Sequence, residues 1–447
     1  MRALYAAASA TLALLLIVIY PPLSVARSNH NIDSALYWIS RLESPDRVLL
    51  SSREIEYLNS DTLKKSGQMA EVWRMPEGVS GTELRGRLLY DTVPVDIAVK
   101  RYDSKGRRIR ERFFEGLAVN LNLDGVEEYN RVRFGVVAAE ADVRALPTDE
   151  AVLKRPGRSG FDTLQYSSVF PAEPVALLHT SLDKRWGFFQ TPTVRGWIRI
   201  DTVAFGTRED VTPPSDEPFL TVTGSLVNVY GDRALKTLVG TVDMGTVLYL
   251  SGGNGEESVG PWAVRFPQRG PKGELVWTEA YISRRGNVHP GYLPYTRGNV
   301  IRQAFRMIGE GYGWGGRGGR RDCSEFIKDV FLPFGIRLPR NSRDQGDSGN
   351  VMARLDGAHS KGVLAAALKT ATPGITLLTL KRHVMLHIGS LSGRQYVIHQ
   401  VSGYWDGKRF KSLNRVVVSS LELGKRSKKG PLKDRITSVT EVLTPEL

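Results

Sequence analysis

Apolar and polar residues change their spacing several times along the chain, and these changes divide it into regions. Apolar residues recur at helical spacing over residues 33–42, and residues 54–65 predict a second helix. Residues 88–137 alternate between apolar and polar positions instead, most clearly over 93–99, which predicts strands. We therefore expect residues 28–135 to form a mixed domain of helices and strands that braces the rest of the chain.

Short strands separated by glycine- and proline-containing turns are predicted from residue 136 onwards. In residues 136–208 they are 142–147, 174–178, 186–190 and 196–200, and in residues 217–285 they are 227–230, 246–250, 262–266 and 275–277. The stretch Pro213-Pro214-Ser215-Asp216 is a natural linker between the two series. Both series resemble bacterial SH3-like domains, in which a strand such as Gly196-Trp197-Ile198 closes a small barrel.

Residues 290–447 have a different character, with helices first and strands afterwards. Helices are expected over 300–308 and 323–331, and strands over 383–389 and 395–401. Helices before a small antiparallel sheet are typical of an α+β catalytic domain. The predicted fold class is therefore an α+β multidomain chain: a mixed N-terminal domain, two SH3-like β-barrels and a C-terminal α+β domain.

The N-terminus indicates export. Arg2 precedes an apolar run over residues 3–20, and two prolines end the run before Ser24-Val25-Ala26, which has small residues where a signal peptidase would need them. We expect residues 1–26 to be a cleaved signal peptide and the rest to lie in the periplasm or cell envelope. An uncleaved anchor helix is the alternative, since the run approaches the roughly 20 residues that span a bilayer.

Composition and charge narrow the possible partners. With 41% hydrophobic and 24% charged residues, the 447-residue chain has the composition of folded protein. The net charge is 61 − 47 = +14, which favours an anionic partner. For an exported chain we expect anionic envelope polymer to meet this basic surface, and not nucleic acid. The sequence carries no signal for an oligomeric state.

The single cysteine, Cys323, cannot form an intramolecular disulfide. It stands where a glycine-rich loop over residues 311–319 gives way to the helix predicted from 323. Unpaired backbone N–H groups at a helix N-terminus favour thiolate, so this placement predicts a nucleophile. The alternative is a buried structural cysteine.

A nucleophilic thiol needs a base, and the predicted hairpin selects two of the seven histidines. If the hairpin turns near Leu391, His399 lies opposite His383, with roughly 5 Å between their Cβ atoms. We therefore expect His383 to be the base for Cys323 and His399 to orient its imidazole. His387 would face Gln395 and is expected to be a surface or spectator residue. A zinc site built from Cys323, His383 and His399 is the alternative, and we expect neither a metal nor a cofactor.

These residues match a family. The segments Tyr312-Gly313-Trp314-Gly315-Gly316, Asp322-Cys323-Ser324, Gly335 to Ser342, His383 to Gly389 and Ile398-His399 closely resemble the NlpC/P60 cysteine peptidases. The order of the regions further resembles the γ-D-glutamyl-L-diamino-acid endopeptidases of that family, which cut cell-wall stem peptides.

The resemblance implies a role for several positions. Cys323 would be the nucleophile, His383 the base and His399 the third member. Asp322, Ser324 and Ser342 would form the pocket for a free N-terminal amine, beside Tyr312 and Trp314. In the first SH3-like domain, Asp162, Gln165 and Tyr166 would narrow the cleft. Asp322 also suits the N-cap of the helix, and both roles are compatible.

Two positions depart from the family pattern. Glu325 stands where a glycine often follows Cys-Ser, and the acidic residue that commonly follows Pro-Gly is missing after Pro373-Gly374. Glu325 adds negative charge near the thiol.

The function predicted from the sequence is an exported hydrolase of peptidoglycan stem peptides. It would cleave the bond between γ-linked D-Glu and the diamino acid in peptides with a free N-terminal L-Ala, through an acyl-enzyme on Cys323. One alternative is a wall-binding SH3 protein with a catalytically weak peptidase domain. The other is an amidase or acyltransferase on the same fold.

Overall fold

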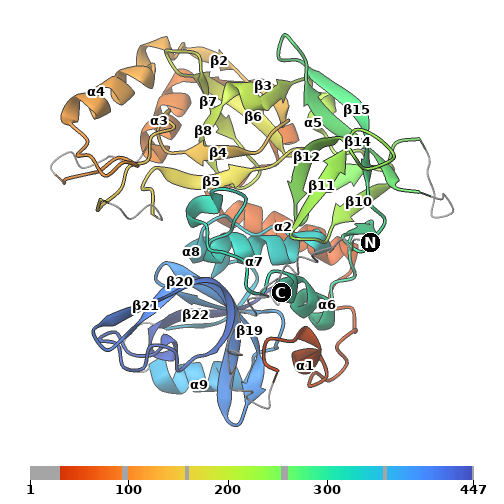
Figure 1. Ribbon diagram of the computed structural model, residues 1–447, viewed down its shortest axis with the longest axis vertical. Helices are drawn as coiled ribbons and strands as arrows, with labels where there is room; N and C mark the ends of the chain where they lie inside the picture. Colours follow the sequence, from red (N-terminus) through yellow and green to blue (C-terminus); the bar gives the residue numbers. More distant parts are fainter. Residues whose placement is uncertain (1–30, 93–98, 157–160, 253–259, 356–359, 445–447) are drawn as a thin grey trace, which may run out of the picture.

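The computed structural model of the chain describes residues 31–92, 99–156, 161–252, 260–355 and 360–444. The predicted signal segment 1–26 lies outside these residues, as does most of the alternating stretch 93–99. Across the described ranges, no helix is long and apolar enough to span a membrane. The α+β multidomain class is confirmed: β-rich modules lie in the upper half of Figure 1, and a helix-and-sheet domain lies below them.

The N-terminal helices contribute to two separate cores. α1 (Ala35–Ile39) and α2 (Ser52–Lys65) match the two predicted helices. Trp38 of α1 is buried, and its ring lies 5.3 Å from that of Tyr396 in the C-terminal domain. α3 (Gly81–Asp91) and α4 (Glu111–Asn120) pack instead with the first β module. The N-terminal helices thus connect the two halves of the molecule.

The prediction of strands throughout residues 88–137 is wrong. The end of α3 and the whole of α4 lie in this stretch, and among its described residues the strands are β2 (Tyr129–Arg131) and β3 (Arg133–Val137). Leu117 and Leu121 are four residues apart and buried in one core. The alternation over residues 93–99 was extended to the whole stretch, so the helical spacing of apolar residues over α4 was missed.

The first β module is one seven-stranded sheet in the order β5-β4-β8-β7-β6-β3-β9. Its further strands are β4 (Ala141–Arg144), β5 (Gln165–Val169), β6 (Pro174–Thr180), β7 (Trp186–Gln190), β8 (Arg195–Arg199) and β9 (Val203–Phe205). The four predicted strands are present. β5 was not predicted, and it is the strand that contacts the C-terminal domain.

The second β module follows a short helix, α5 (Arg208–Val211), and holds two small sheets. Its strands are β10 (Phe219–Val222), β11 (Leu226–Tyr230), β12 (Leu238–Asp243), β13 (Val247–Tyr249), β14 (Trp262–Arg269), β15 (Leu275–Ile282) and β16 (Val288–Pro290). They enclose a core of their own. All four predicted strands occur here, and the assignment of a second SH3-like domain stays a prediction.

The C-terminal domain is an antiparallel sheet in the order β17-β22-β18-β19-β20-β21 with helices against it. The strands are β17 (Asn350–Arg354), β18 (Thr376–Leu380), β19 (His383–Leu391), β20 (Arg394–Asp406), β21 (Arg409–Ser420) and β22 (Ile436–Glu441). The helices are α6 (Arg297–Arg306), α7 (Cys323–Phe331), α8 (Ser342–Gln345) and α9 (Ser360–Thr370).

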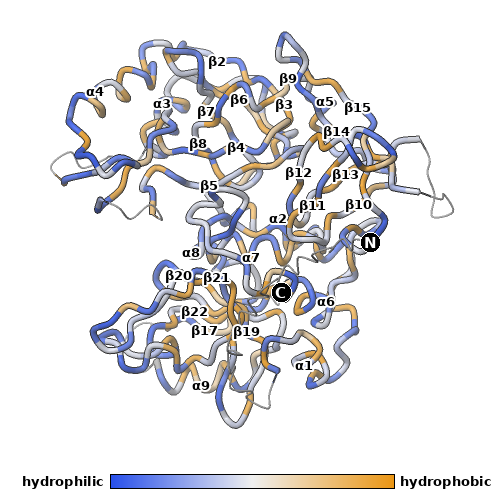
Figure 2. The backbone as a smooth tube through the Cα atoms, viewed as in Figure 1, coloured by the Kyte–Doolittle hydropathy of each residue, from blue (hydrophilic) through white to orange (hydrophobic). Residues whose placement is uncertain are grey.

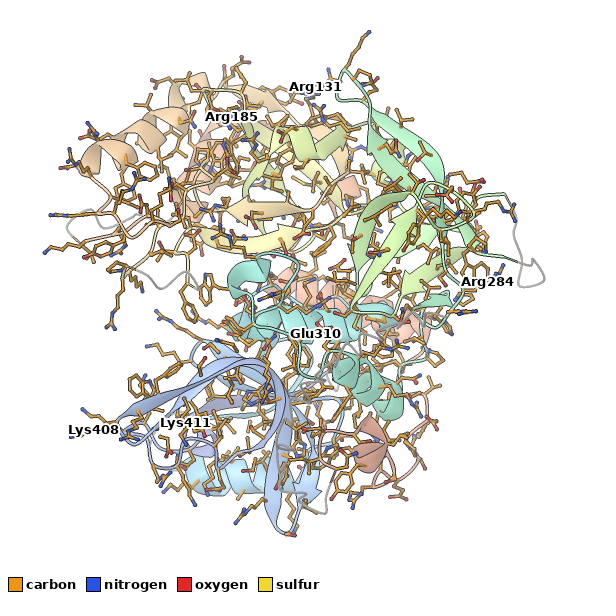
Figure 3. The ribbon with its side chains drawn as sticks, in the orientation of Figure 1. Arg131, Arg185, Arg284, Glu310, Lys408 and Lys411 are labelled. Carbon is orange, nitrogen blue, oxygen red and sulfur yellow. The ribbon has the colours of Figure 1, made fainter. Side chains whose placement is uncertain are left out.

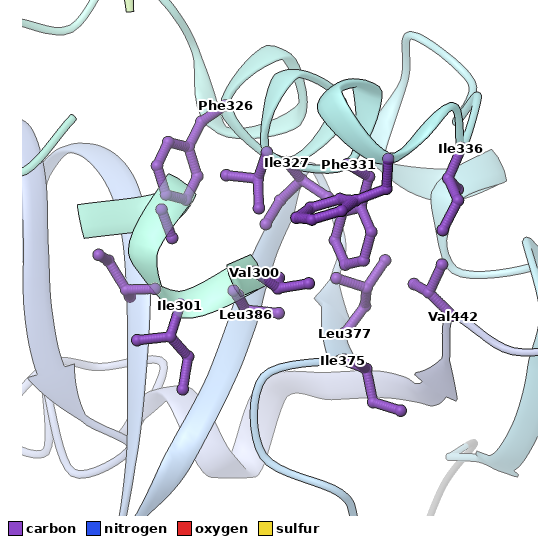
Figure 4. Packing of buried hydrophobic residues seen from close by; sticks show 14 of the residues in the cluster. Val300, Ile301, Phe326, Ile327, Phe331, Ile336, Ile375, Leu377, Leu386 and Val442 are labelled. Atoms are coloured by element: carbon purple, nitrogen blue, oxygen red, sulfur yellow. The ribbon is translucent and has the colours of Figure 1, made fainter. Parts of the chain in front are cut away.

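α7 is buried on all sides, between the sheet and the β modules (Figure 1). Figure 4 shows its apolar side, where Phe326, Ile327 and Phe331 pack against residues of α6 and β18. Figure 2 shows the apolar residues gathered along the elements that meet there. Its polar side is also covered, so its charges need partners: Lys328 Nζ lies 2.7 Å from Asp329 Oδ1.

Candidate active site

Cys323 is the first residue of α7, as predicted, and Asp322 is the N-cap. One oxygen of the Asp322 carboxylate accepts hydrogen bonds from the backbone N–H groups of Ser324 (3.1 Å) and Glu325 (3.0 Å). Cys323 as a whole residue is 9% exposed. The capping therefore fixes the backbone on which the thiol stands, at the edge of a cavity.

The glycine-rich loop before α7 lies directly on β5 of the first β module. Gly315 and Gly316 have positive φ angles of 61° and 79°. A Cβ atom on Gly316 would come 2.9 Å from the Ser168 backbone nitrogen, and one on Gly315 would come 3.0 Å from the Gln165 carbonyl oxygen. Glycine is therefore required at both positions by conformation and by space.

His383 and His399 meet as the hairpin argument expected, although the strand register differs. His383 Nε2 lies 2.8 Å from His399 Nδ1, and His399 Nε2 lies 3.0 Å from Ser419 Oγ. The turn falls at residues 392–393, and a bulge between His387 and Gly389 shifts the pairing, so that Leu386 pairs with Ile398. The imidazoles therefore meet diagonally across β19 and β20, and not directly opposite each other.

His387 is not a surface residue, contrary to expectation. Its side chain is only 2% exposed, and its Nε2 lies 2.9 Å from Gln395 Oε1. The contact with Gln395 was predicted, but the face was thought to be open. Met385 of the same face is buried in a second core between the sheet and α9, which explains the burial.

Burial works against the thiolate that the helix N-terminus was expected to favour. Burial raises the pKa of the Cys323 thiol to about 12, and the nearby Asp322 carboxylate adds to the effect. Burial and the positive charge of Arg435 lower the pKa of His383 to about 4. Burial thus opposes the charged forms of both Cys323 and His383, which line the same cavity.

Arg340 holds the carboxylates beside the thiol. Its guanidinium donates to Asp322 Oδ2 (2.9 Å), to Ser324 Oγ (2.9 Å) and to Ser167 Oγ of β5 (2.8 Å), and it also pairs with Glu325. Asp322 is buried, yet Arg340 and the capping N–H groups hold its pKa below the usual value. This arginine stands in the motif quoted for the family resemblance, but nothing in the sequence alone revealed its partners.

Glu325, the departure from the family pattern, is neutralised. Besides Arg340, it lies 3.1 Å from Lys328 Nζ, and its carboxylate accepts a hydrogen bond from Ser167 Oγ. The negative charge of Glu325 is thus balanced by Arg340 and Lys328, and its carboxylate links α7 to the first β module through Ser167.

The first β module lines one side of the cavity, but its polar groups are largely engaged. Asp162 pairs with Arg144 at 2.6 Å, and its carbonyl oxygen accepts a hydrogen bond from Trp314 Nε1. Gln165 donates to the Gly315 carbonyl oxygen (3.1 Å), and the Tyr166 hydroxyl donates to that of Asp91 (2.6 Å). Asp162 is 2% exposed, and its contacts therefore stabilise this side of the cavity.

One cavity of about 1430 Å³ brings the predicted residues together. It is lined by Cys323, His383, His399, Asp322, Ser324, Ser342, Tyr312, Trp314, Asp162, Gln165 and Tyr166. Its walls come from the first β module, α7 and the β20–β21 hairpin. Within the described ranges, no group of three or more His, Cys, Asp or Glu side chains is placed to hold a metal ion.

Comparisons with known proteins agree with this arrangement. Residues 154–199 match the SH3 domain of SH3b1 type, and residues 309–412 match the NlpC/P60 family. The chain thus carries an SH3-type β module ahead of its C-terminal domain. That C-terminal domain is an NlpC/P60 family domain, as the motifs predicted.

A solved structure shares the architecture of most of the chain. An NlpC/P60 endopeptidase from Photobacterium damselae subsp. piscicida is 19% identical and superposes with a TM-score of 0.73, over 92% of this chain and 97% of that chain. An NlpC/P60 family protein from Bacillus cereus ATCC 10987 is 17% identical with a TM-score of 0.45, over 63% of this chain and 83% of that one. No curated protein matches the chain.

Proposed function

We propose that the chain is an exported cysteine peptidase that hydrolyses peptidoglycan stem peptides at the bond between γ-linked D-Glu and the diamino acid. The observation that carries this proposal is the constellation in the cavity: a lone thiol at the N-terminus of α7 and a linked pair of imidazoles. The NlpC/P60 match and the endopeptidase named among the solved structures support it.

The hydrogen-bond chain sets the tautomers that the reaction needs. For His383 Nδ1 to accept the thiol proton, the Nε2 proton must lie toward His399 Nδ1. His399 then carries its own proton on Nε2 and donates it to Ser419 Oγ. His399 thus orients the base and stabilises it once it is charged, which is the role of the third member in such a triad.

The reaction proceeds through an acyl-enzyme. Cys323 Sγ attacks the γ-carbonyl carbon of D-Glu as its proton passes to His383, so that two buried charges are not created before substrate binds. The C–N bond then breaks, and His383 returns the proton to the leaving amine. A water molecule, deprotonated by the same imidazole, hydrolyses the thioester and restores the thiol.

The oxyanion would be stabilised by few donors. The backbone N–H groups of Ser324 and Glu325 already donate to Asp322. In this first turn of α7, the backbone N–H of Cys323 is therefore the group that would donate to the oxyanion. Tyr312 lines the same cavity, and burial together with the nearby Asp322 and Cys323 keeps its pKa above the usual value. Its hydroxyl therefore stays protonated and is a second donor.

A free N-terminal amine would bind beside Asp322, between α7 and the first β module, with Ser342 and Tyr166 nearby. Asp322 would then share its charge between Arg340 and the ammonium group.

The test is mass spectrometry of L-Ala-γ-D-Glu-diaminopimelate after incubation with the purified chain, beside a Cys323→Ala control and an N-acetylated peptide. Release of L-Ala-D-Glu only from the free-amine peptide and only with Cys323 present is the expected result. Cleavage of both peptides would remove the amine pocket. Binding to murein sacculi without cleavage of either peptide would favour the wall-binding alternative.

A further inference from the structure

The negative and positive side chains that line the cavity are distributed unevenly around it. Its carboxylates are Asp91, Asp162 and Asp322, on α3, the first β module and the N-cap of α7. Its basic residues on the opposite side are Lys381, Arg382, Lys408, Lys428, Lys429 and Arg435. We call these six residues the basic arm. Lys154 and Arg155 also line the cavity, from the first β module.

The basic arm has no counter-charge in the parts of the chain that the structure describes. The three cavity carboxylates are paired, with Arg195, Arg144 and Arg340. Other basic residues near the arm are paired too, Lys411 and Arg426 with Asp406 and Lys433 with Glu422. No ion pair with a described residue is formed by any member of the arm. The arm therefore presents free positive charge to the cavity.

The arm is part of a surface that extends away from the thiol. Figure 3 shows Lys408 at the tip of the β20–β21 hairpin, which projects from the sheet. At the same tip, the exposed rings of Trp405 and Phe410 lie 5.5 Å apart and line the cavity. Arg435, which is half-buried at the end of a 3-10 helix, also lines the cavity, and its positive charge lowers the pKa of His383.

The carboxylates and the basic arm correspond to the two sides of the bond to be cleaved: Asp322 to the amine side, and the basic arm to the leaving-group side. If the amine end of the peptide binds beside Asp322, the chain runs past Cys323 and the leaving group lies toward His383 and the arm. A leaving group that begins with diaminopimelate carries a side-chain carboxylate and a terminal carboxylate. Guanidinium and ammonium groups are the natural partners of such anions.

We infer that the basic arm, Arg435 included, is a subsite for the carboxylates of the leaving group and makes the enzyme prefer acidic leaving groups to amidated ones. The inference rests on the proposed function and names its specificity on the far side of the cleaved bond.

The experiment compares kcat/KM of the full chain for two peptides. One is L-Ala-γ-D-Glu-diaminopimelate-D-Ala, and the other has the same sequence with both leaving-group carboxylates amidated. The wild type is expected to prefer the acidic peptide by about tenfold or more, as for one charge-assisted hydrogen bond. The preference should fall as salt is raised from about 0.05 to 0.5 M, because exposed charges are screened.

Arg435→Gln should remove most of the preference by slowing the acidic peptide alone. Since Arg435 also acts on His383, the ratio of the two peptides is the readout, because any change in the base affects both. The exposed pair Lys428→Gln/Lys429→Gln is a second variant, expected to lower the ratio by a smaller factor. Arg426→Gln is the control, since Arg426 is paired with Asp406 and does not line this cavity. Its ratio should equal that of the wild type.

The outcomes separate two failures. Equal rates for the two peptides with the wild type, or an Arg435→Gln variant that slows both alike, would overturn the subsite and leave the peptidase. Cleavage of neither peptide would overturn the proposed function and the subsite together.

Discussion

Removal of the Arg340 guanidinium should cost the molecule much of its stability. The side chain is 8% exposed and is bonded to Asp322, Ser324 and Ser167 and paired with Glu325. In Arg340→Met, Asp322 loses its cation and Glu325 keeps only Lys328. Breaking a buried ion pair from one side costs about 3–5 kcal/mol. At about 2–4 °C per kcal/mol for a domain of this size, the Tm should fall by about 6–20 °C.

The stability that the Arg340–Asp322 pair contributes depends on pH. Arg340 holds the pKa of Asp322 low, so the pair contributes stability above the usual pKa of the carboxyl and loses it as pH falls through the folded value. In Arg340→Met the Asp322 pKa should rise instead, because burial remains. The difference in Tm between the two proteins should therefore be largest near neutral pH and shrink toward pH of about 4.

Calorimetry of four proteins measures this effect. Arg340→Met/Glu325→Gln should recover part of the loss, since one unpaired charge is gone. Arg426→Met, which removes an arginine bonded twice to Asp406 on the surface, is the matched control and should cost about 1 kcal/mol or less. An Arg340→Met variant within about 2 °C of the wild type at pH 7 would refute the account of the buried network.

Three further predictions concern the loop, the partners of the base and the partly buried acid Glu173. Gly316→Ala should cost about 1–3 kcal/mol in thermal unfolding, because alanine disfavours φ of 79° and its Cβ would meet Ser168. His399→Ala should lower kcat/KM by about 100-fold or more, and Ser419→Ala by about twofold to tenfold, with Tm nearly unchanged in Ser419→Ala. Burial raises the pKa of Glu173 to about 8, so the wild type should lose stability between pH of about 4.5 and 8 as the unfolded state ionises first. The Glu173→Gln variant should lose less stability than the wild type over this pH interval. Parallel curves of Tm against pH for the two proteins would contradict the raised pKa of Glu173.

Local patterns predicted the elements that carry the thiol and the histidines. The apolar stripe of α7 and the end of the glycine-rich loop fixed Cys323 at a helix N-terminus. The alternation of β19 and β20, with a turn between them, brought His383 to His399 even though a bulge changed the register. Both inferences depend on residues close in sequence, where spacing decides geometry.

Contacts between distant segments were not predictable. Arg340 in the loop before α8 is joined to Ser167 of β5 and Glu325 of α7, and no single period marks these residues. The raised pKa of Cys323 also follows from tertiary burial, which opposes the effect of the helix terminus that the sequence does show. The same reason explains His387: β19 is covered on both faces, so alternation could not tell an open face from a second core.

The central claim is that Cys323 carries the acyl group during peptide hydrolysis. The most direct measurement is intact-mass and peptide-level mass spectrometry after rapid acid quench of the chain turning over L-Ala-γ-D-Glu-diaminopimelate. The account predicts an added L-Ala-γ-D-Glu acyl group on the peptide containing Cys323, and neither the adduct nor hydrolysis in Cys323→Ala. An adduct at another residue, or hydrolysis by Cys323→Ala at the wild-type rate, would contradict it.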